Sequence, residues 1–329
     1  MTQTPSVYTA HDIPDLLNAL PTLFGFRPEE SLVAIATSGP RRRFGFRLRV
    51  DMPSREQVDD LAEVVVGHLS RHGAEGAIVM AVTLDQEVAQ ALLAAIERLL
   101  PPITLVVAVR ADGDRYWSDE PGFPPGGLAY ETSDHHLAVV QAIAAGQQIL
   151  PDRQALVDRF AAVAGPRRAW LEQAADEILR QVVPLMARTS EDDLASVGMQ
   201  QVQPILDRGL AGERLSDDDI TRFSVWVNGI PVRDEVWNQI TGETADDMLR
   251  LLTLVSRSVV PPFEPAVLSL AAFAAWLTGD GAQALIAVER ALRADETYSM
   301  ARLMLQMLEG GIAPSHWLAL RAADCRSSP

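Results

Sequence analysis

Hydrophobic residues between about residues 12 and 110 alternate between a helical and a strand period. Apolar runs at 44–50, 76–84 and 103–110 predict strands, and amphipathic segments that begin after Ser54 and Asp85 predict helices between them. Strand, helix, strand, helix, strand is the order of two consecutive βαβ units. Because such crossovers join strands of one direction, the order predicts an α/β domain with a mixed, mostly parallel sheet.

Two further elements precede this pattern. A helix is predicted over 12–24, because Gly25 is a natural left-handed stop after its last apolar residue. The apolar run at 31–36 predicts a strand that forms an antiparallel hairpin with 44–50.

A long loop and a helical region follow. Residues 111–134 are rich in Pro, Gly and Asp and show no period, and loops of this length in compact domains are either functional or disordered. Beyond the loop, helical periodicity continues to the end of the chain. The sequence therefore predicts an α/β domain over 1–150 and an all-helical domain over 151–329.

Residues 264–309 resemble one tetratricopeptide unit, with Gly279-Asp280 in the turn between two helices. Glu296 stands where such units usually carry proline, and solenoids need about three repeats for stability. Two interpretations are open. The segment is a helical hairpin packed on its neighbours, or it offers a protein partner an apolar groove lined by Trp276, Tyr298 and Leu303.

Lysine is absent, and all 28 basic residues are arginines. This argues against a P-loop nucleotide site, a pyridoxal phosphate Schiff base and a kinase. One cysteine, Cys325, argues against an intrachain disulfide and an iron–sulfur cluster. A net charge of −16 disfavours nucleic acids and anionic membranes as partners. With no apolar run of about 18 residues, the sequence predicts an acidic cytoplasmic protein without a membrane span.

Several short motifs occur in a fixed order: LPTLFGFRPEESLVAIA, RLRVDMP, RYWS, PPGG, VRD and AAWLTGDGAQA. In this order they resemble the actinobacterial family known as domain of unknown function 4192. The resemblance covers nearly the whole chain and implies a fold shared within that family, but no activity. Relatives often carry cysteines between the RYWS and PPG elements, and their absence here weakens a metal or redox role for the loop.

Arginines gather on one face of the predicted strand at 44–50. Strand alternation places Phe46 and Leu48 on one face and Arg47 and Arg49 on the other. The arginines are either solvated and paired with Glu29 and Glu30, or they bind an anion. In the second case Tyr116 and Trp117, from the long loop, would cover the anion.

Aspartates follow three predicted strands, namely Asp51, Asp85 and Asp112. Ligands of parallel sheets bind outside the carboxyl ends of the strands, so these carboxylates would hold a hard cation such as Mg²⁺ if they converge. The alternative is local structure, because Asp85 is a good helix cap and Asp112 is typical of a turn.

Histidines offer two weaker sites. Within SDHH, Asp134 and His135 form a possible acid–base pair, although the segment also suits the start of a helix. His68 and His72 have a zinc-compatible spacing but no third ligand in sight.

The sequence leaves two functions open. The first is a non-catalytic interaction or regulatory protein whose helical domain binds a protein partner. The second is a metal-assisted hydrolase, or another enzyme that binds a nucleotide or small anion, at the carboxyl edge of the sheet. The second requires the arginines, aspartates and long loop to meet in one crevice. Sequence alone determines neither substrate nor oligomeric state.

Overall fold

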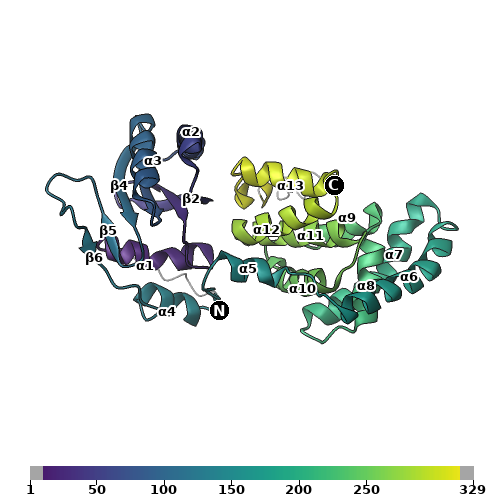
Figure 1. The fold of residues 1–329 in the computed structure, drawn as a ribbon. Coiled ribbons are helices and arrows are strands. Elements are labelled where there is room, and N and C mark those ends of the chain that lie inside the picture. The colour runs from purple at the N-terminus through teal and green to yellow at the C-terminus, as the bar shows by residue number, and fades with distance from the viewer. Residues whose placement is uncertain (1–9, 319–329) are drawn as a thin grey trace. The chain divides into compact units, whose positions relative to one another are not determined.

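The structure is a computed structural model that describes residues 10–318, and the predicted terminal thiol Cys325 lies outside them. The chain divides into two compact units, residues 1–153 and 154–329 (Figure 1). The first is an α/β unit and the second is helical. Among the described helices, none combines the length and the apolar composition needed to cross a membrane.

Six strands form one sheet in the order β2-β1-β3-β4-β5-β6. Their bounds are β1 Ser31–Ser38, β2 Arg43–Asp51, β3 Gly76–Val82, β4 Thr104–Ala111, β5 Arg115–Trp117 and β6 Leu128–Ala129. The β1–β2 hairpin is antiparallel, as predicted. The sheet is mixed, but the prediction that it is mostly parallel is wrong, because β3–β4 is the single parallel pair among these described strands.

Strand β1 explains this difference. It lies between β2 and β3 and is antiparallel to both, so β2 and β3 share a direction without being neighbours. All but the last residue of β1 are buried. A strand that is apolar on both faces is stable only in the interior of a sheet, and β1 therefore separates the two strands that the first βαβ unit would have paired.

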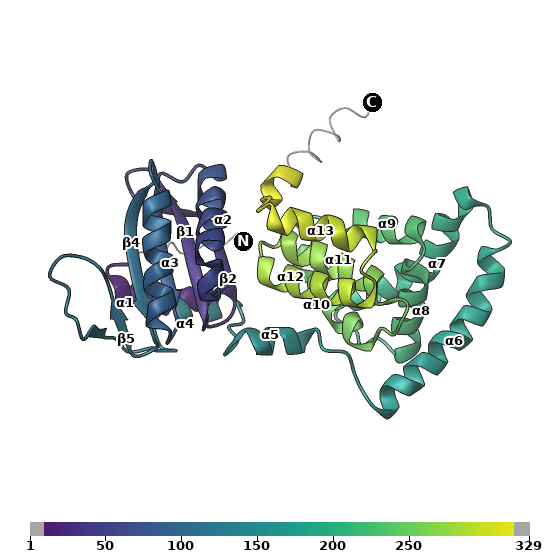
Figure 2. The same ribbon diagram turned by 45° about the horizontal axis from the view of Figure 1, so that its top comes forward.

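Helices cover both faces of the sheet. Helix α1 (Ile13–Phe24) and α4 (Leu137–Ala144) lie on one side, and α2 (Val58–Arg71) and α3 (Gln86–Leu99) lie on the other (Figure 1). Figure 2 shows α2 and α3 side by side on their face. Asp12 caps α1 and Asp85 caps α3 through side-chain hydrogen bonds, and Gly25 ends α1 at φ 75°. The short helix η1 (Arg55–Gln57) leads into α2, and the Ser54 backbone N–H donates to Gln57 there.

Two apolar cores result, one on each face of the sheet. The α2–α3 core contains Leu32, Ala34, Val79 and Leu92, and the α1 core contains Leu17, Val33, Ile35 and Met80. Strand alternation in β2 follows the prediction, since Phe46, Leu48 and Val50 pack on the α2–α3 core.

The long loop is more ordered than its composition indicated. Strands β5 and β6 within residues 111–134 extend the sheet by an antiparallel pair. These strands have only three and two residues, whereas an alternating pattern can be recognised only over about four residues or more. For this reason the sequence showed no strand period here.

The helical unit is built around one buried helix. Its helices are α5 Arg153–Arg159, α6 Pro166–Met186, α7 Glu191–Leu210, α8 Asp217–Val227, α9 Ile230–Asn238, α10 Ala245–Ser258, α11 Glu264–Leu277, α12 Gly281–Ala294 and α13 Ser299–Glu309. Every residue of α11 is buried. A helix that is apolar on all sides belongs in the interior, and α11 accordingly packs against α10, α12 and α13.

A buried arginine ties these helices together. Arg290 on α12 forms an ion pair with Glu264 at 2.8 Å, and both side chains are almost fully buried. The guanidinium also donates to the carbonyl oxygens of Ser256, at 2.7 Å, and Phe160. Because protein groups satisfy its charge and its donors, Arg290 serves packing within this unit.

Candidate functional site

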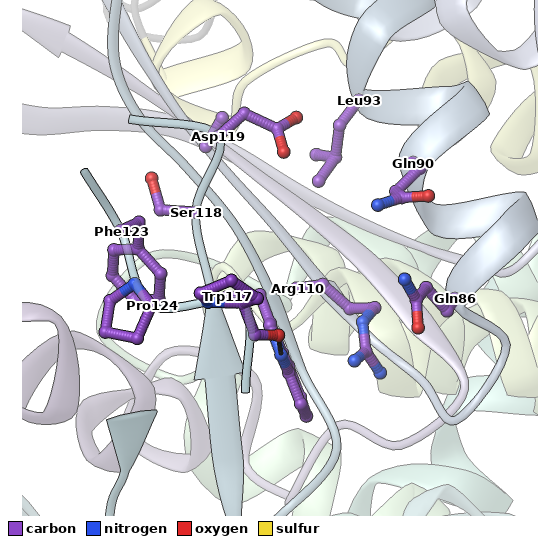
Figure 3. Close-up of a pocket in the computed structure, with 11 residues that line it drawn as sticks. Gln86, Gln90, Leu93, Arg110, Trp117, Ser118, Asp119, Phe123 and Pro124 are labelled. Atoms are coloured by element: carbon purple, nitrogen blue, oxygen red, sulfur yellow. Dashed lines mark hydrogen bonds between the residues drawn. The ribbon is translucent and has the colours of Figure 1, made fainter. Parts of the chain in front are cut away.

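The α/β unit contains a pocket on the α3 side of the sheet, between α3, strand β4 and the segment from Trp117 to Pro125, with Arg110 near the carboxyl end of β4. Its volume is about 260 Å³. It is lined by Gln86, Gln90, Leu93, Ala108, Arg110, Trp117, Ser118, Asp119, Phe123, Pro124 and Pro125 (Figure 3). This position agrees with the rule that ligands of α/β sheets bind outside the carboxyl ends of parallel strands. The volume is slightly below the range of roughly 300 to 1,000 Å³ that is typical of pockets for drug-sized ligands, so a ligand of this pocket would be small.

Arg110 is the most buried polar residue that lines this pocket. Its neighbours Val109 and Ala111 pack into the α1 core, so alternation along β4 directs Arg110 to the opposite face. The residue is 7% exposed. Its Nη1 donates to the Thr83 carbonyl oxygen at 3.3 Å, and its guanidinium carbon lies 3.6 Å from the centre of a Trp117 ring.

No carboxylate pairs with Arg110 in the described part of the chain. Burial lowers the pKa of its guanidinium below the usual arginine value, and nearby Asp112 acts in the opposite direction. Arginine nevertheless stays charged in proteins. A buried cation with one carbonyl and one aromatic ring as its partners has donors available for an anion.

A turn in the long loop holds Trp117 against Arg110. The indole Nε1 donates to the Pro125 carbonyl oxygen at 3.2 Å. From the same strand, Arg115 donates to the carbonyl oxygens of Gly126 and Gly127 at 2.8 and 2.9 Å. The RYWS and PPGG motifs therefore bind each other, and together they form one wall of the pocket.

Gly127 is required in this turn for two reasons. Its φ of +70° is in the left-handed region that side-chain-bearing residues rarely adopt. A Cβ at this position would also lie 2.6 Å from Cε2 of Trp117. The glycine thus allows the turn to approach the indole closely.

The remaining polar groups lie along α3 and on the facing loop. Gln86 and Gln90 are four residues apart, which places both amides on one side of α3. Arg110 lies beside Gln86 at one end of the pocket, whereas Asp119 lies beside Leu93 at the other (Figure 3). Asp119 is exposed, and none of the ion pairs among the described residues includes it.

A strained glutamate supports the carbonyl that holds Arg110. Glu30 has φ +41°, which is rare for a residue other than glycine. Its carboxylate accepts hydrogen bonds from the Thr83 hydroxyl at 2.7 Å and the Leu84 backbone N–H at 3.2 Å. These contacts fix residue 83, whose carbonyl oxygen is the acceptor for Arg110.

The predicted anion-binding residues do not come together. Arg47 donates to the Leu23 carbonyl oxygen, and Arg49 donates to the Ser31 hydroxyl and forms an ion pair with Asp51 at 2.6 Å. Both contacts lie on the α1 face of edge strand β2, whereas the pocket lies on the α3 face beside β4. A shared site of these arginines with Trp117 is therefore wrong, because the sheet stands between them.

Tyr116 and Trp117 also point in opposite directions. Tyr116 is buried in the α1 core and contacts Phe123 and Tyr130, and burial raises the pKa of its phenol. Trp117 lines the pocket. Neighbouring strand residues alternate between faces, and for this reason one site cannot use both.

The three aspartates do not form a metal site. The described residues contain no group of three His, Cys, Asp or Glu side chains that could hold a metal ion. Asp85 caps α3 by accepting from the Val88 backbone N–H at 3.0 Å. Asp112 accepts from the backbone N–H groups of residues 114 and 115, and Asp51 pairs with Arg49. Each carboxylate thus has a local role, which is the second of the two interpretations that the sequence left open.

The SDHH segment lies away from the pocket. Asp134 forms an exposed ion pair with Arg27 at 2.8 Å, and His135 is exposed. His136 rather than Ser133 or Asp134 is the N-cap of α4, and its ring contacts Asp15 at 3.2 Å. Neither Asp134 nor His135 is among the residues that line the pocket.

His68 and His72 form a stack with an aromatic ring. The Phe46 ring is parallel to His72 at 3.9 Å and to His68 at 5.8 Å. Burial, followed by the nearby charges of Arg71 and His72, lowers the pKa of His68. The pair thus packs strand β2 against α2.

The predicted groove of the helical unit is filled. Trp276 is 3% exposed and its indole N–H donates to the Ile312 carbonyl oxygen at 2.8 Å. The Tyr298 hydroxyl accepts from Arg233, and Leu303 alone of the three is half-exposed. The three side chains do not line one open surface, and a protein partner for this unit stays a prediction from the sequence.

The sequence did not identify Gln86, Gln90 and Asp119 as pocket residues, and it indicated Arg110 only by its position at the carboxyl end of a predicted strand. The available signal was an arginine at the carboxyl end of the otherwise apolar run ITLVVAVR, which a buried strand tolerates only with a partner. The glutamines had no signal, because exposed amides on a first helical turn are common.

The chain belongs to the family described as domain of unknown function (DUF4192), whose model matches residues 14–315. The match spans both units and includes every residue that lines the pocket. No curated protein and no solved structure matches the chain.

Proposed function

We propose that the α/β unit binds a small organic anion at Arg110, and that the protein is a cytoplasmic, non-catalytic regulatory or ligand-binding protein. One observation carries this proposal. The buried guanidinium of Arg110 lines a pocket, and no carboxylate of the described residues forms an ion pair with it. Leaving a buried charge without a counterion costs free energy, and an anionic ligand would remove that cost.

The composition of the pocket supports binding rather than catalysis. Its lining contains no histidine, cysteine or lysine, and its one hydroxyl belongs to Ser118. The Ser118 oxygen accepts from the Glu120 backbone N–H at 3.3 Å. Nucleophilic catalysis requires a base that is hydrogen-bonded to the nucleophile, and no such bond joins Ser118 to the lining carboxylate Asp119 among the hydrogen bonds of the described residues.

The aromatic wall indicates a flat ligand. Trp117 covers one side of the guanidinium, and Phe123 and the two prolines extend the apolar surface. A carboxylate or phosphate attached to a planar ring would combine an ionic contact with Arg110 and a stacking contact with these side chains.

Titration of the full chain with benzoate and with phenyl phosphate tests the proposal, with neutral benzamide as the comparison. The readout is the ¹⁹F signal of fluorinated Trp117, which is the single tryptophan of residues 1–153. We expect at least one of the two anions to bind with a dissociation constant of about 1 mM, typical of a fragment, and benzamide to bind at least about tenfold more weakly.

Variants then locate the binding. Arg110→Gln should abolish the anion's advantage over benzamide. Arg98→Gln should keep it, because Arg98 lies on α3 outside the pocket and pairs with Asp59. Equal binding of benzamide and both anions to the natural chain would overturn the proposal without recourse to any variant.

A further inference from the structure

The pocket carries opposite charges at its two ends. Arg110 lies beside Gln86, near the start of α3, and Asp119 lies beside Leu93, two turns further along the helix (Figure 3). Neither charge has an ion-pair partner in the described part of the chain. A purely anionic ligand would satisfy the first charge and place its other end near the second carboxylate.

We infer that the ligand is a zwitterion, with a carboxylate at Arg110 and an amine at Asp119. This inference rests on the proposed function and names the ligand class of the same pocket. The apolar side chains of Leu93, Trp117 and Phe123 also line the pocket, which suits a ligand with a hydrocarbon or aromatic spacer between its charged groups.

The length of the pocket limits the spacing of the two ligand groups. The rise along α3 from Gln86 to Leu93 is about 10 Å at about 1.5 Å per residue. Each charged hydrogen bond occupies about 3 Å of that length, which leaves at least about 4 Å between the ligand's carboxylate and its amine. An α-amino acid head group is too short for this spacing, whereas an ω-amino acid or a ring-spaced amino acid fits it.

Matched probes separate the amine contact from the anion contact. Para-toluate and para-(aminomethyl)benzoate share the carboxylate and the ring and differ in the amine. Because Asp119 is exposed, we expect the amine to tighten binding to the natural chain by about 2- to 5-fold, as measured by calorimetry.

Two loop variants identify the carboxylate responsible. Asp119→Asn should remove the gain from the amine while para-toluate still binds. Glu120→Gln makes the same charge change one residue further along the loop, outside the pocket lining, and should keep the gain. Equal affinities of the two probes for the natural chain, or an equal loss of the gain in both variants, would overturn the inference.

A chain-length series checks the spacing independently. Among glycine, β-alanine, γ-aminobutyrate and δ-aminovalerate, each compared with the carboxylate that lacks the amine, the gain should be largest for the last two. A gain that is largest for glycine would contradict the assigned spacing. Failure of para-toluate and benzoate alike to bind through Arg110 would instead refute carboxylate recognition, so the two proposals fail in different ways.

Discussion

The two units of this protein each bury an arginine, and they treat its charge in opposite ways. In the helical unit, Arg290 has a buried carboxylate and two carbonyl oxygens as acceptors. In the α/β unit, Arg110 has one carbonyl oxygen at 3.3 Å and the face of an indole. The first is a closed network within a packed core, and the second borders an open pocket.

This difference separates a structural role from a binding role. A buried ion pair that protein groups satisfy completely leaves nothing for a ligand. A buried cation with spare donors costs stability unless something outside the chain pairs with it. The comparison therefore rests on what each arginine contributes to folding, which mutation can measure.

The largest expected effect is at Arg290. Arg290→Met leaves Glu264 buried without its counterion, and we expect a loss of about 3 to 5 kcal/mol in the free energy of unfolding of the helical unit. Arg110→Met leaves no buried carboxylate without its counterion, and it should lower the free energy of unfolding of the α/β unit by less than about 1 kcal/mol. Denaturant unfolding measures both, with Trp117 reporting on the α/β unit and the other five tryptophans on the helical unit.

A double variant serves as the control. Arg290→Met combined with Glu264→Met removes both charges and should recover much of the stability lost in the single variant. If Arg110→Met destabilised its unit as strongly as Arg290→Met does, Arg110 would be a packing residue and the contrast between the units would disappear.

A smaller effect is expected at the pocket wall. Gly127→Ala imposes a side chain on a left-handed backbone and a clash with Trp117, and should cost about 1 to 3 kcal/mol. Gly122→Ala is the matched control, because this loop glycine has φ +86° with no atom within 4 Å of a built Cβ. Only Gly127→Ala should also shift the ¹⁹F signal of Trp117, and equal shifts in both variants would show that the turn does not hold the indole.

These contrasts show where sequence reasoning succeeds. Hydrophobic period and capping residues determine local structure, so the hairpin, the Asp85 cap and the left-handed stop at Gly25 were all predictable. The position of β1 between β2 and β3 was not predictable in this way. Strand order depends on a comparison of all the strands, in which the one that is apolar on both faces takes an interior position.

The site was harder to predict for a related physical reason. Asp51, Asp85 and Asp112 follow strands of one direction, but each is satisfied by nearby groups that the sequence does not rank. Arg110 differs from Arg49 only in what surrounds it after folding. Whether a polar side chain has protein partners or is available to a ligand depends on the tertiary structure. Residue type and spacing alone do not determine it.

The histidine stack gives the stability of the α/β unit a pH dependence. Burial lowers the pKa of His68, and Arg71 and His72 contribute to the shift. Between this lowered pKa and the usual value of about 6.5, the unfolded chain binds a proton that the folded chain does not. Stability of the α/β unit should therefore be complete above that window and fall as the pH is lowered through it.

Denaturant unfolding between about pH 7.5 and about pH 5.5 measures this slope. In His68→Gln the part of the slope due to this side chain is absent, so the Trp117-reported transition should depend less on pH than in the natural chain. An unchanged slope would show that groups of the unit other than His68 are responsible for the pH dependence.

The smallest expected effect is at Asp51, where the sequence had suggested a metal ligand. Its side chain is 74% exposed and pairs with Arg49, which also donates to Ser31 and to the Glu29 carbonyl oxygen. Asp51→Asn should therefore cost less than about 1 kcal/mol, because an exposed ion pair contributes little and Arg49 keeps its other acceptors.

Millimolar Mg²⁺ or EDTA should leave the unfolding temperature unchanged in both the natural chain and Asp51→Asn. If Mg²⁺ raised the unfolding temperature of the natural chain by several degrees but not that of Asp51→Asn, the carboxylates at this edge of the sheet would come together to bind the ion. In that event the α/β unit would have a second charged group, besides Arg110, that is available to a ligand. The difference from the helical unit, whose buried Arg290 is paired within the protein, would then be larger.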